Sequence, residues 1–337
     1  MIIDAHAHVN APPALYAYQA NLLASRGSHG RGDAGVSDAV LKEWGEQTVQ
    51  VMDRVGTTLQ LISPRPYSLS HASTPGRVVR WWIDAVNDVI ARQSALFPGR
   101  LAAVAGLPQT MEDGPAQWAA ALRRAVTEYG FVGFLLNPDP AEGMGHVPPL
   151  GNEYWYPLYE TMVELNVPAL IHSSGCGNGR ETYSEHFITE ESIAVLTLLN
   201  SDVFQRFPTL KIIVGHGGGS VPYQIGRWRA ARLHPRLRQG YAINESFDDA
   251  IGRLWFDTVL HNPDSLELLI KTVGAERCVF GTEKPGSASV PDPATGRDLD
   301  DLKPVIDGFG FLTDADRQLI FEQNARGLFP LPSSLWP

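Results

Sequence analysis

Short apolar runs recur along the chain, and each is rich in residues that favour β-strands. Their near-continuous apolar character, without strict alternation, is typical of strands buried on both faces of a parallel sheet. The pattern therefore predicts eight buried strands. They span Met1–Ala5, Thr58–Ser63, Leu101–Leu107, Val132–Asn137, Ala169–Ser173, Lys211–Gly215, Leu254–Val259 and Cys278–Gly281.

Segments with helical periodicity separate these runs. Ser37 suits the cap of a helix that runs to about Val55, and Pro75 stands near the first position of one that runs to about Leu96. Strands that alternate with helices imply parallel pairing and right-handed crossovers. Further helices are predicted at about 113–129, 152–165, 189–206, 262–273 and 313–326.

Eight strand–helix units favour a closed barrel, so the predicted fold is a (β/α)8 TIM barrel of the α/β class. We expect residues 1–337 to form one domain. The alternative is an open doubly wound sheet, but no G-x-G-x-x-G follows the first strand. Two segments, roughly 10–36 and 174–188, exceed ordinary connections. We expect both to be long loops on the C-terminal face, where loops usually carry function, and Phe329–Pro337 to be a tail docked on a surface.

Composition narrows the range of partners. The formal net charge is −10, which argues against non-specific nucleic-acid binding but leaves room for an anionic substrate beside a local Arg cluster or a metal. The two cysteines, Cys176 and Cys278, do not imply a disulfide scaffold. No signal-peptide pattern and no apolar run of about 18 residues is present. We therefore expect a cytoplasmic protein with no nucleic-acid or membrane partner.

Aromatic residues leave the oligomeric state open. Trp81, Trp82, Trp228 and Trp255 offer aromatic surface for a homo-oligomer, and we expect a dimer. Packing in the core of one chain explains the same residues equally well.

The first strand carries a pair of histidines. His6 and His8 stand two positions apart in the sequence Ile-Asp-Ala-His-Ala-His-Val. Side chains at positions i and i+2 of a strand point the same way, so both imidazoles enter one space. The pair favours a metal site, since imidazole is a good ligand for Zn²⁺ and related ions. The alternative is a pair that packs or hydrogen-bonds in the barrel, which is costly to satisfy without a metal.

Three further groups stand where strands end. His172 ends the fifth run, His216 ends the sixth and Glu283 follows the eighth. The C-terminal ends of all strands converge on one face of a barrel, so these side chains should meet His6 and His8. The remaining histidines, at positions 29, 71, 146, 186, 234 and 261, lie in predicted loops or helix ends. We expect most of them to be solvated, with His71 and His186 able to reach the mouth of the barrel.

This arrangement resembles the amidohydrolase superfamily. The sequences Ile-His-Ser at strand five and Val-Gly-His-Gly-Gly-Gly at strand six are similar to its decarboxylase-and-hydratase branch, and the resemblance runs from Met1 to about Phe329. Most members carry Asp after strand eight, whereas this chain has Gly-Thr-Glu-Lys-Pro-Gly around Glu283, which is similar to the hydratases. The resemblance implies Zn²⁺ and the addition of water to the carbon–carbon double bond of 4-oxalomesaconate, with 4-carboxy-4-hydroxy-2-oxoadipate as product.

On this basis the sequence leads to a specific hypothesis for the site. His6, His8, His172 and Glu283 would surround one Zn²⁺ ion, although Mn²⁺, Fe²⁺ and Co²⁺ accept similar ligands. Glu283 would also accept a proton from water, and His216 would polarise the substrate carbonyl or deliver a proton. A small polycarboxylate substrate needs cationic and amide partners, for which the candidates are Arg65, Asn178, Arg180, Tyr183 and Ser287.

Several residues and reactions stay open at this point. Cys176 lacks an assigned base, so it is weak evidence for a nucleophile, and Lys284 is interpretable as a structural ion-pair member. A non-oxidative decarboxylase of an aromatic or muconate acid would use the same metal ligands, as would a hydrolase of a C–C, lactone or amide bond. A barrel that only binds small molecules, without catalysis, would lack some of the metal-binding residues, and none of these residues is missing from the sequence.

Overall fold

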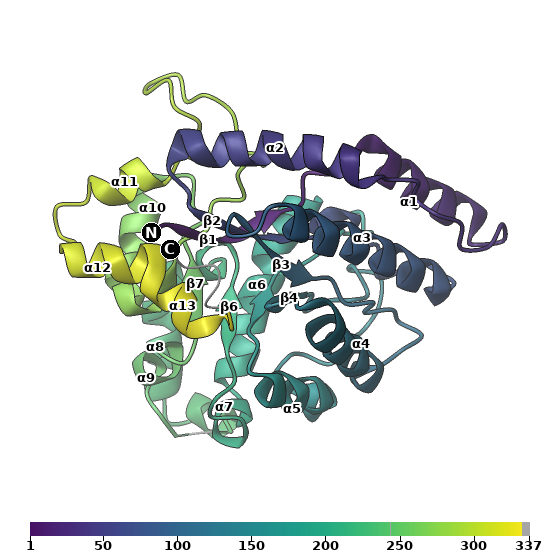
Figure 1. Cartoon of the computed structure of the whole chain (residues 1–337). Coiled ribbons are helices and arrows are strands. Elements are labelled where there is room, and N and C mark those ends of the chain that lie inside the picture. The colour runs from purple at the N-terminus through teal and green to yellow at the C-terminus, as the bar shows by residue number, and fades with distance from the viewer. Residues whose placement is uncertain (243, 332–337) are drawn as a thin grey trace.

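Eight parallel strands form the centre of the molecule, in the order in which they occur along the chain. The computed structural model describes residues 1–242 and 244–331. Hydrogen bonds from Ala5 N to Phe280 O and from Glu283 N to His6 O, both 2.8 Å long, join the last strand to the first. The predicted (β/α)8 barrel is thereby confirmed (Figure 1). The strands are β1 Ile3–His8, β2 Leu59–Ser63, β3 Leu101–Ala105, β4 Gly133–Leu136, β5 Ala169–Ile171, β6 Ile212–Val214, β7 Trp255–Asp257 and β8 Cys278–Val279.

Helices surround this barrel, as the alternation of apolar runs and helical periodicity predicts (Figure 1). The α-helices are α1 Pro13–Ser25, α2 Asp38–Val55, α3 Gly76–Leu96, α4 Pro115–Tyr129, α5 Tyr156–Leu165, α6 Tyr183–Leu199, α7 Val203–Arg206, α8 Ile225–Leu233, α9 Phe247–Ile251, α10 Pro263–Val273, α11 Lys303–Asp307, α12 Asp314–Gln318 and α13 Asn324–Leu328. Short 3₁₀ turns are η1 Pro66–Ser68, η2 Glu153–Trp155, η3 His216–Gly218, η4 Pro222–Gln224, η5 Leu237–Gly240 and η6 Ala275–Arg277, and η7 Leu319–Gln323 is a π turn.

Two helix starts follow the predicted signals. Ser37 caps α2, and its side chain accepts a hydrogen bond from Val40 N. Pro75 stands one residue earlier than predicted, at the N-cap of α3. The predicted helix at 313–326 is interrupted, because the π turn η7 separates α12 from α13.

The two segments predicted as long loops are partly helical, which corrects the sequence interpretation. Within 10–36 the chain forms α1, which Pro13 begins at its first position. The glycines at 27–35 come after this helix and do not prevent it. Within 174–188 the chain enters α6 at Tyr183, because Thr182 and Glu185 form a capping box there.

The core lies between the barrel and its helices. All six residues of β1 are buried, including Asp4, His6 and His8. Trp82 is fully buried in the core, and Trp81, Trp228 and Trp255 pack partly buried against it. Packing within the chain therefore accounts for much of this aromatic surface, and the predicted dimer stays a prediction.

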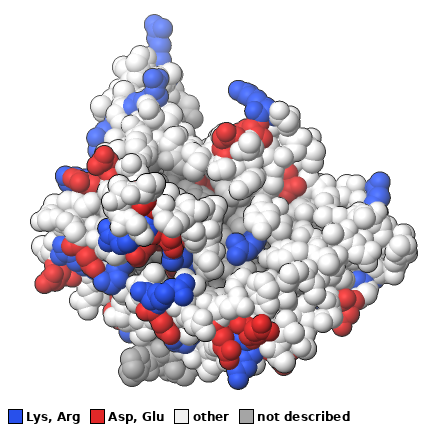
Figure 2. All heavy atoms as spheres, turned by 90° about the horizontal axis from the view of Figure 1, so that it is seen from above, with Lys and Arg blue, Asp and Glu red and all other residues white. Residues whose placement is uncertain are grey.

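The surface carries charges of both signs. In the view from above, acidic and basic side chains lie next to one another over one side of the molecule, and much of the other side is uncharged (Figure 2). The surface is hollowed near the middle of this view, and a basic side chain lies in the hollow. Among the described residues, we find no helix with the length and apolar character to cross a membrane.

Candidate functional site

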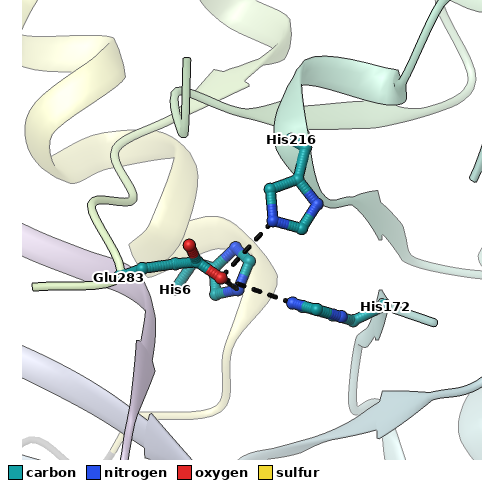
Figure 3. Close-up of side chains that lie close together, drawn as sticks. All are labelled: His6, His172, His216 and Glu283. Carbon is teal, nitrogen blue, oxygen red and sulfur yellow. Dashed lines mark hydrogen bonds and ion pairs between the residues drawn. The ribbon is translucent and has the colours of Figure 1, made fainter. Parts of the chain in front are cut away.

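Four imidazole rings converge on one carboxylate oxygen. His6 and His8 come from β1, His172 follows β5, His216 begins the turn after β6, and Glu283 follows β8. The Nε2 atom of His8 lies 3.2 Å from Glu283 Oε1. The Nε2 atoms of His6, His172 and His216 each lie 3.4 Å from the same oxygen. The rings of His6, His172 and His216 surround the Glu283 carboxylate in Figure 3.

The opposite nitrogen of each ring is held by a partner outside this cluster. Hydrogen bonds to Nδ1 fix how each ring is turned, so that Nε2 faces the centre. The site is therefore built in two layers, of which the outer one orients the inner one. The Nδ1 partners are Asp257 Oδ2 for His6, Ser63 Oγ for His8, Ser173 O for His172 and the Glu191 carboxylate for His216.

The backbone is strained at two of the five residues. His216 has φ +48° and Glu283 has φ +58°, in the left-handed region that residues with a Cβ seldom adopt. Such strain persists where the surrounding structure over-determines it, and it clusters at functional sites. Close packing also matters here, since a Cβ on Gly281 would lie 2.8 Å from His6 Cβ. Strands β8 and β1 could not approach this closely with a larger residue at Gly281.

Burial and charge act on the ionisable groups in opposite directions. Burial lowers the pKa of His8 and of His172 to about 4, so both rings are neutral at neutral pH, the state in which imidazole binds metals. Burial would also lower the pKa of His216, but the Glu191 carboxylate raises it well above the usual value. Burial would raise the pKa of Glu283, whereas its contacts with the rings of His172 and His216 hold it well below its usual range.

These residues fit a divalent metal ion. His6 Nε2 is buried and has no hydrogen-bond partner, which is costly unless the atom binds something else. Ligand atoms of His6, His172, His216 and Glu283 all lie within 4.8 Å of one another. Imidazole nitrogen together with carboxylate oxygen is the donor set of Zn²⁺ and similar ions. The Nε2 atom of His8 lies nearer to Glu283 Oε1 than that of His216, at 3.2 Å against 3.4 Å, but the group of ligand atoms that lie within 4.8 Å of one another contains His216 and not the predicted ligand His8.

A cavity of about 310 Å³ opens beside this cluster. Arg65, Tyr183 and Ser287, all predicted to contact substrate, line it. The rings of Tyr67 and Tyr183 lie 6.1 Å apart, and both are about half exposed. Glu283 is the only acidic residue in the lining among the described residues, so the cavity suits anions once a metal is bound. The other lining residues are His8, Pro66, Tyr67, Ser184, Phe187, Ile188, His216, Val259, Leu260, His261, Glu283 and Gly286.

Two predicted substrate contacts, Asn178 and Arg180, are not brought to the cavity. Both residues are exposed in the turn that precedes α6. The side chain of Asn178 is used within this turn, because it donates to Glu181 and accepts from the backbone N–H of Arg180. The polar groups of this segment therefore stabilise the turn.

Sequence reasoning missed three residues near the cluster. Asp257 ends β7 and could have been noticed as an acid directly after an apolar run. Glu191 is fully buried in α6, on the same face as Ala194, Val195 and Leu198, and an acid on the apolar face of a helix is a readable signal. His261 was expected to be solvated, but it is half-buried and lines the cavity.

Two other histidines lie in separate buried networks. His71 bonds Leu107 O and the side chain of Asn137, and His186 pairs with Asp139 and Glu181. Neither belongs to the lining of the cavity.

Asp4 and Lys284 connect the strands behind the site. Asp4 accepts hydrogen bonds from Gln60 and Thr282, and burial raises its pKa to about 6. Lys284 lies 2.5 Å from Asp298 and 2.6 Å from Asp300 and is buried. Its ion pairs fit the structural role expected of it.

Comparisons with known proteins place these observations in context. A family model described as amidohydrolase matches residues 3–331. A 2-keto-4-carboxy-3-hexenedioate hydratase from Sphingobium sp. (strain NBRC 103272 / SYK-6) is 35% identical over 336 residues, which cover 98% of this chain and 96% of that one.

Solved structures show the same similarity to hydratases. A 4-oxalomesaconate hydratase from Rhodopseudomonas palustris has a TM-score of 0.87 at 32% identity, covering 98% of this chain and 96% of that chain. A dihydroxybenzoic acid decarboxylase from Polaromonas sp. JS666, with bound manganese and the inhibitor 2-nitroresorcinol, has a TM-score of 0.72 at 26% identity, covering 100% and 99%. The hydratases are thus more similar to this chain than this decarboxylase is.

Proposed function

The chain belongs to the amidohydrolase family, and on that premise we propose that it is a metal-dependent hydro-lyase. Its substrate would be 4-oxalomesaconate and its product 4-carboxy-4-hydroxy-2-oxoadipate, in the catabolism of protocatechuate and other lignin-derived aromatics. Full-length similarity to two hydratases supports this reaction. The observation that carries it is the position of Glu283, whose carboxylate lies among four imidazole nitrogens and also lines the cavity.

One divalent ion would be held by His6, His8, His172 and Glu283, and we propose Zn²⁺. Manganese, which is bound in the related decarboxylase, is the nearest alternative. When bound, the ion lowers the pKa of a water molecule so that it can act as a nucleophile near neutral pH.

Glu283 is the proposed general base. Its low pKa keeps it ionised, and its carboxylate faces both the histidine cluster and the cavity. Water adds its oxygen to the substrate carbon that is β to the ketone, and Glu283 accepts the proton released. In the isomer whose double bond is conjugated to the ketone, 2-keto-4-carboxy-3-hexenedioate, for which the Sphingobium relative is named, the double-bond electrons move toward the ketone and give an enolate.

His216 is the proposed acid. Its Nδ1 is held by Glu191, and its raised pKa keeps the ring protonated at neutral pH. The Nε2–H would stabilise the enolate oxygen and then deliver a proton to the carbon α to the ketone. This step balances the addition, since one hydroxyl and one hydrogen are added across the double bond.

Three lining residues would bind the substrate carboxylates. Arg65 presents a fixed fork of donors that matches a carboxylate, and Ser287 and Tyr183 add hydroxyl donors. The positive charge of Arg65 also acts on Tyr16, where it opposes the rise in pKa that burial causes.

Decarboxylation of an aromatic acid is the second candidate. The likeness to the Polaromonas decarboxylase over the whole chain favours it, because the same ligands serve both reactions. Decarboxylation requires no attack by water, so Glu283 would not act as a general base in that reaction.

The experiment compares two substrates on one enzyme preparation. Metal-depleted protein is reloaded with Zn²⁺ or Mn²⁺ and mixed with 4-oxalomesaconate or with 2,6-dihydroxybenzoate. We expect absorbance of the conjugated ketone to fall only with the reloaded protein, and no reaction of the aromatic acid. Turnover of 2,6-dihydroxybenzoate alone would replace the hydratase with the decarboxylase.

A further inference from the structure

His261 occupies the cavity without an assigned role. It follows β7 and directly precedes Asn262, which caps α10. The ring lines the same cavity as Arg65, Ser287 and Glu283. It therefore stands on the C-terminal face of the barrel, where substrate must enter.

The ring of His261 lacks the hydrogen bonds that hold the other inner histidines. Its Nδ1 is buried without a partner. Its Nε2 has no partner among the described residues either, and it is not one of the buried unpartnered atoms, so it keeps access to the cavity. Each other buried histidine of residues 1–242 and 244–331 has a partner: Asp257 for His6, Ser63 for His8, Leu107 for His71, Ser173 for His172, Glu181 for His186 and Glu191 for His216.

The Nε2 atom is the ring nitrogen that still reaches the cavity, so a ligand there can supply the hydrogen-bond partner that the described residues do not. The neighbouring lining residues Val259 and Leu260 offer no side-chain acceptor. A substrate carboxylate is the acceptor that the proposed reaction brings into this cavity.

The position of His261 separates it from the other carboxylate binder. Arg65 stands at the end of β2, and β8 and β1 lie between β2 and β7 in the barrel. One carboxylate cannot be shared easily across that span, which contains His6, His8 and Glu283. Two distinct anionic subsites thus flank the metal ligands, on the β2 side and on the β7 side.

We propose that His261 donates a hydrogen bond from Nε2 to a second substrate carboxylate, distinct from the one bound by Arg65, and so selects polycarboxylates. This inference rests on the proposed function, since it assigns a carboxylate of that substrate to a residue. A dicarboxylate would be satisfied by Arg65 with the hydroxyls of Tyr183 and Ser287, whereas a tricarboxylate needs His261 as well.

Binding tests the inference without requiring turnover. Zn²⁺-loaded wild type, His261→Phe and His261→Gln are titrated calorimetrically with propane-1,2,3-tricarboxylate and with pentanedioate, which lacks only the central carboxylate. His234→Gln, at an exposed histidine, is the matched control. We expect His261→Phe to weaken tricarboxylate binding on the order of 10- to 100-fold, with little effect on pentanedioate. Gln retains an N–H donor and should restore part of the affinity.

Kinetics then separate binding from chemistry. With 4-oxalomesaconate we expect a raised KM in His261→Phe with kcat within a few fold, and one metal ion per chain as in wild type. Unchanged tricarboxylate affinity in His261→Phe, or equal losses for both acids, would overturn the proposal. Wild type that binds the tricarboxylate but does not hydrate 4-oxalomesaconate would refute the proposed function alone, and wild type that does neither would refute both.

Discussion

At the residue scale, Glu283 combines two properties that a base next to a metal needs. Its carboxylate stays ionised in a buried place, because the protonated ring of His216 donates to it from Nε2. Its backbone is in the left-handed region, with Glu283 N bonded to His6 O, so the residue is fixed from both ends. The side chain can therefore be replaced without removing the backbone contact that joins β8 to β1.

The Glu283→Gln variant separates the base from the fold. The amide keeps the shape of the carboxylate but cannot accept the proton, so we expect turnover to fall on the order of 10²-fold or more. Circular dichroism should match wild type, and metal analysis should find much of the ion retained. Glu276→Gln, at an exposed glutamate, serves as the control. Near-wild-type turnover in Glu283→Gln would remove this residue from the mechanism.

Asp257 acts on the metal site through His6. It bonds His6 Nδ1 and also accepts from Gly217 N and Val259 N, so the carboxylate itself is held firmly. We expect Asp257→Asn to weaken metal binding about 10- to 100-fold, measured by competition with a chelator. Asp264→Asn changes an exposed aspartate in the same way and should leave the affinity as it is. Equal affinities for wild type and Asp257→Asn would show that His6 does not depend on this partner.

At the element scale, two connections beside the site are held by buried charges. The loop after β4 and helix α6 meet where His186 lies between Asp139 and Glu181. The segment after β8 is held where Lys284 meets Asp298 and Asp300. Each of these two charge networks leads to a prediction about the free energy of unfolding.

The His186 network predicts a loss of stability as pH rises. Burial would lower the pKa of His186, but hydrogen bonds with Asp139 and Glu181 raise it to about 9. A histidine with a raised pKa in the folded state stabilises fully below its unfolded value of about 6.5, and this contribution is lost as pH rises through about 9.

Thermal melts between pH 6 and 9.5 measure this effect. One proton contributes a slope of at most about 1.4 kcal/mol per pH unit, and we expect His186→Gln to flatten the slope between about pH 6.5 and 9. His234→Gln keeps the wild-type slope, since His234 is exposed. The same slope in His186→Gln and in wild type would contradict the assignment.

Lys284 neutralises a carboxylate that water does not reach. Asp300 is fully buried, so Lys284→Met leaves its charge unpaired, and we expect the free energy of unfolding to fall by about 3 to 5 kcal/mol in urea denaturation. Lys284→Met combined with Asp300→Asn should recover part of this loss, because the unpaired charge is gone. The exposed Lys42→Met is the control. Equal stability of Lys284→Met and wild type would exclude a structural role for this ion pair.

The elements differ in how far the sequence predicts them. The strands are readable because each is buried on both faces, so its apolar run stands out. Helix α1 was missed because the two prolines at its start and the glycines after it resemble a loop, although Pro13 stands at the first position, where proline begins helices. Helix α6 begins at a capping box, Thr182 to Glu185, which is a local signal that could have been read.

At the scale of the whole molecule, closure of the barrel explains why the site is partly predictable. Histidines and an acid at strand ends must meet once the strands form a ring, so His6, His172 and Glu283 could be named in advance. The position of Glu191 on the apolar face of α6 shows that it is buried, but the packing of this helix on the barrel decides which histidine it meets. Asn178 and Arg180 are exposed and absent from the cavity lining, and their role in substrate binding stays a prediction.

The mass of the product tests the central claim most directly. The protein loaded with Zn²⁺ is incubated with 4-oxalomesaconate in water enriched in oxygen-18, and the product is analysed by mass spectrometry against the metal-depleted protein. We predict a product heavier than the substrate by one molecule of water, with one heavy oxygen incorporated on carbon. A product lighter by carbon dioxide, or two fragments that together contain the added water, would contradict hydration and assign the metal site to a decarboxylase or a hydrolase.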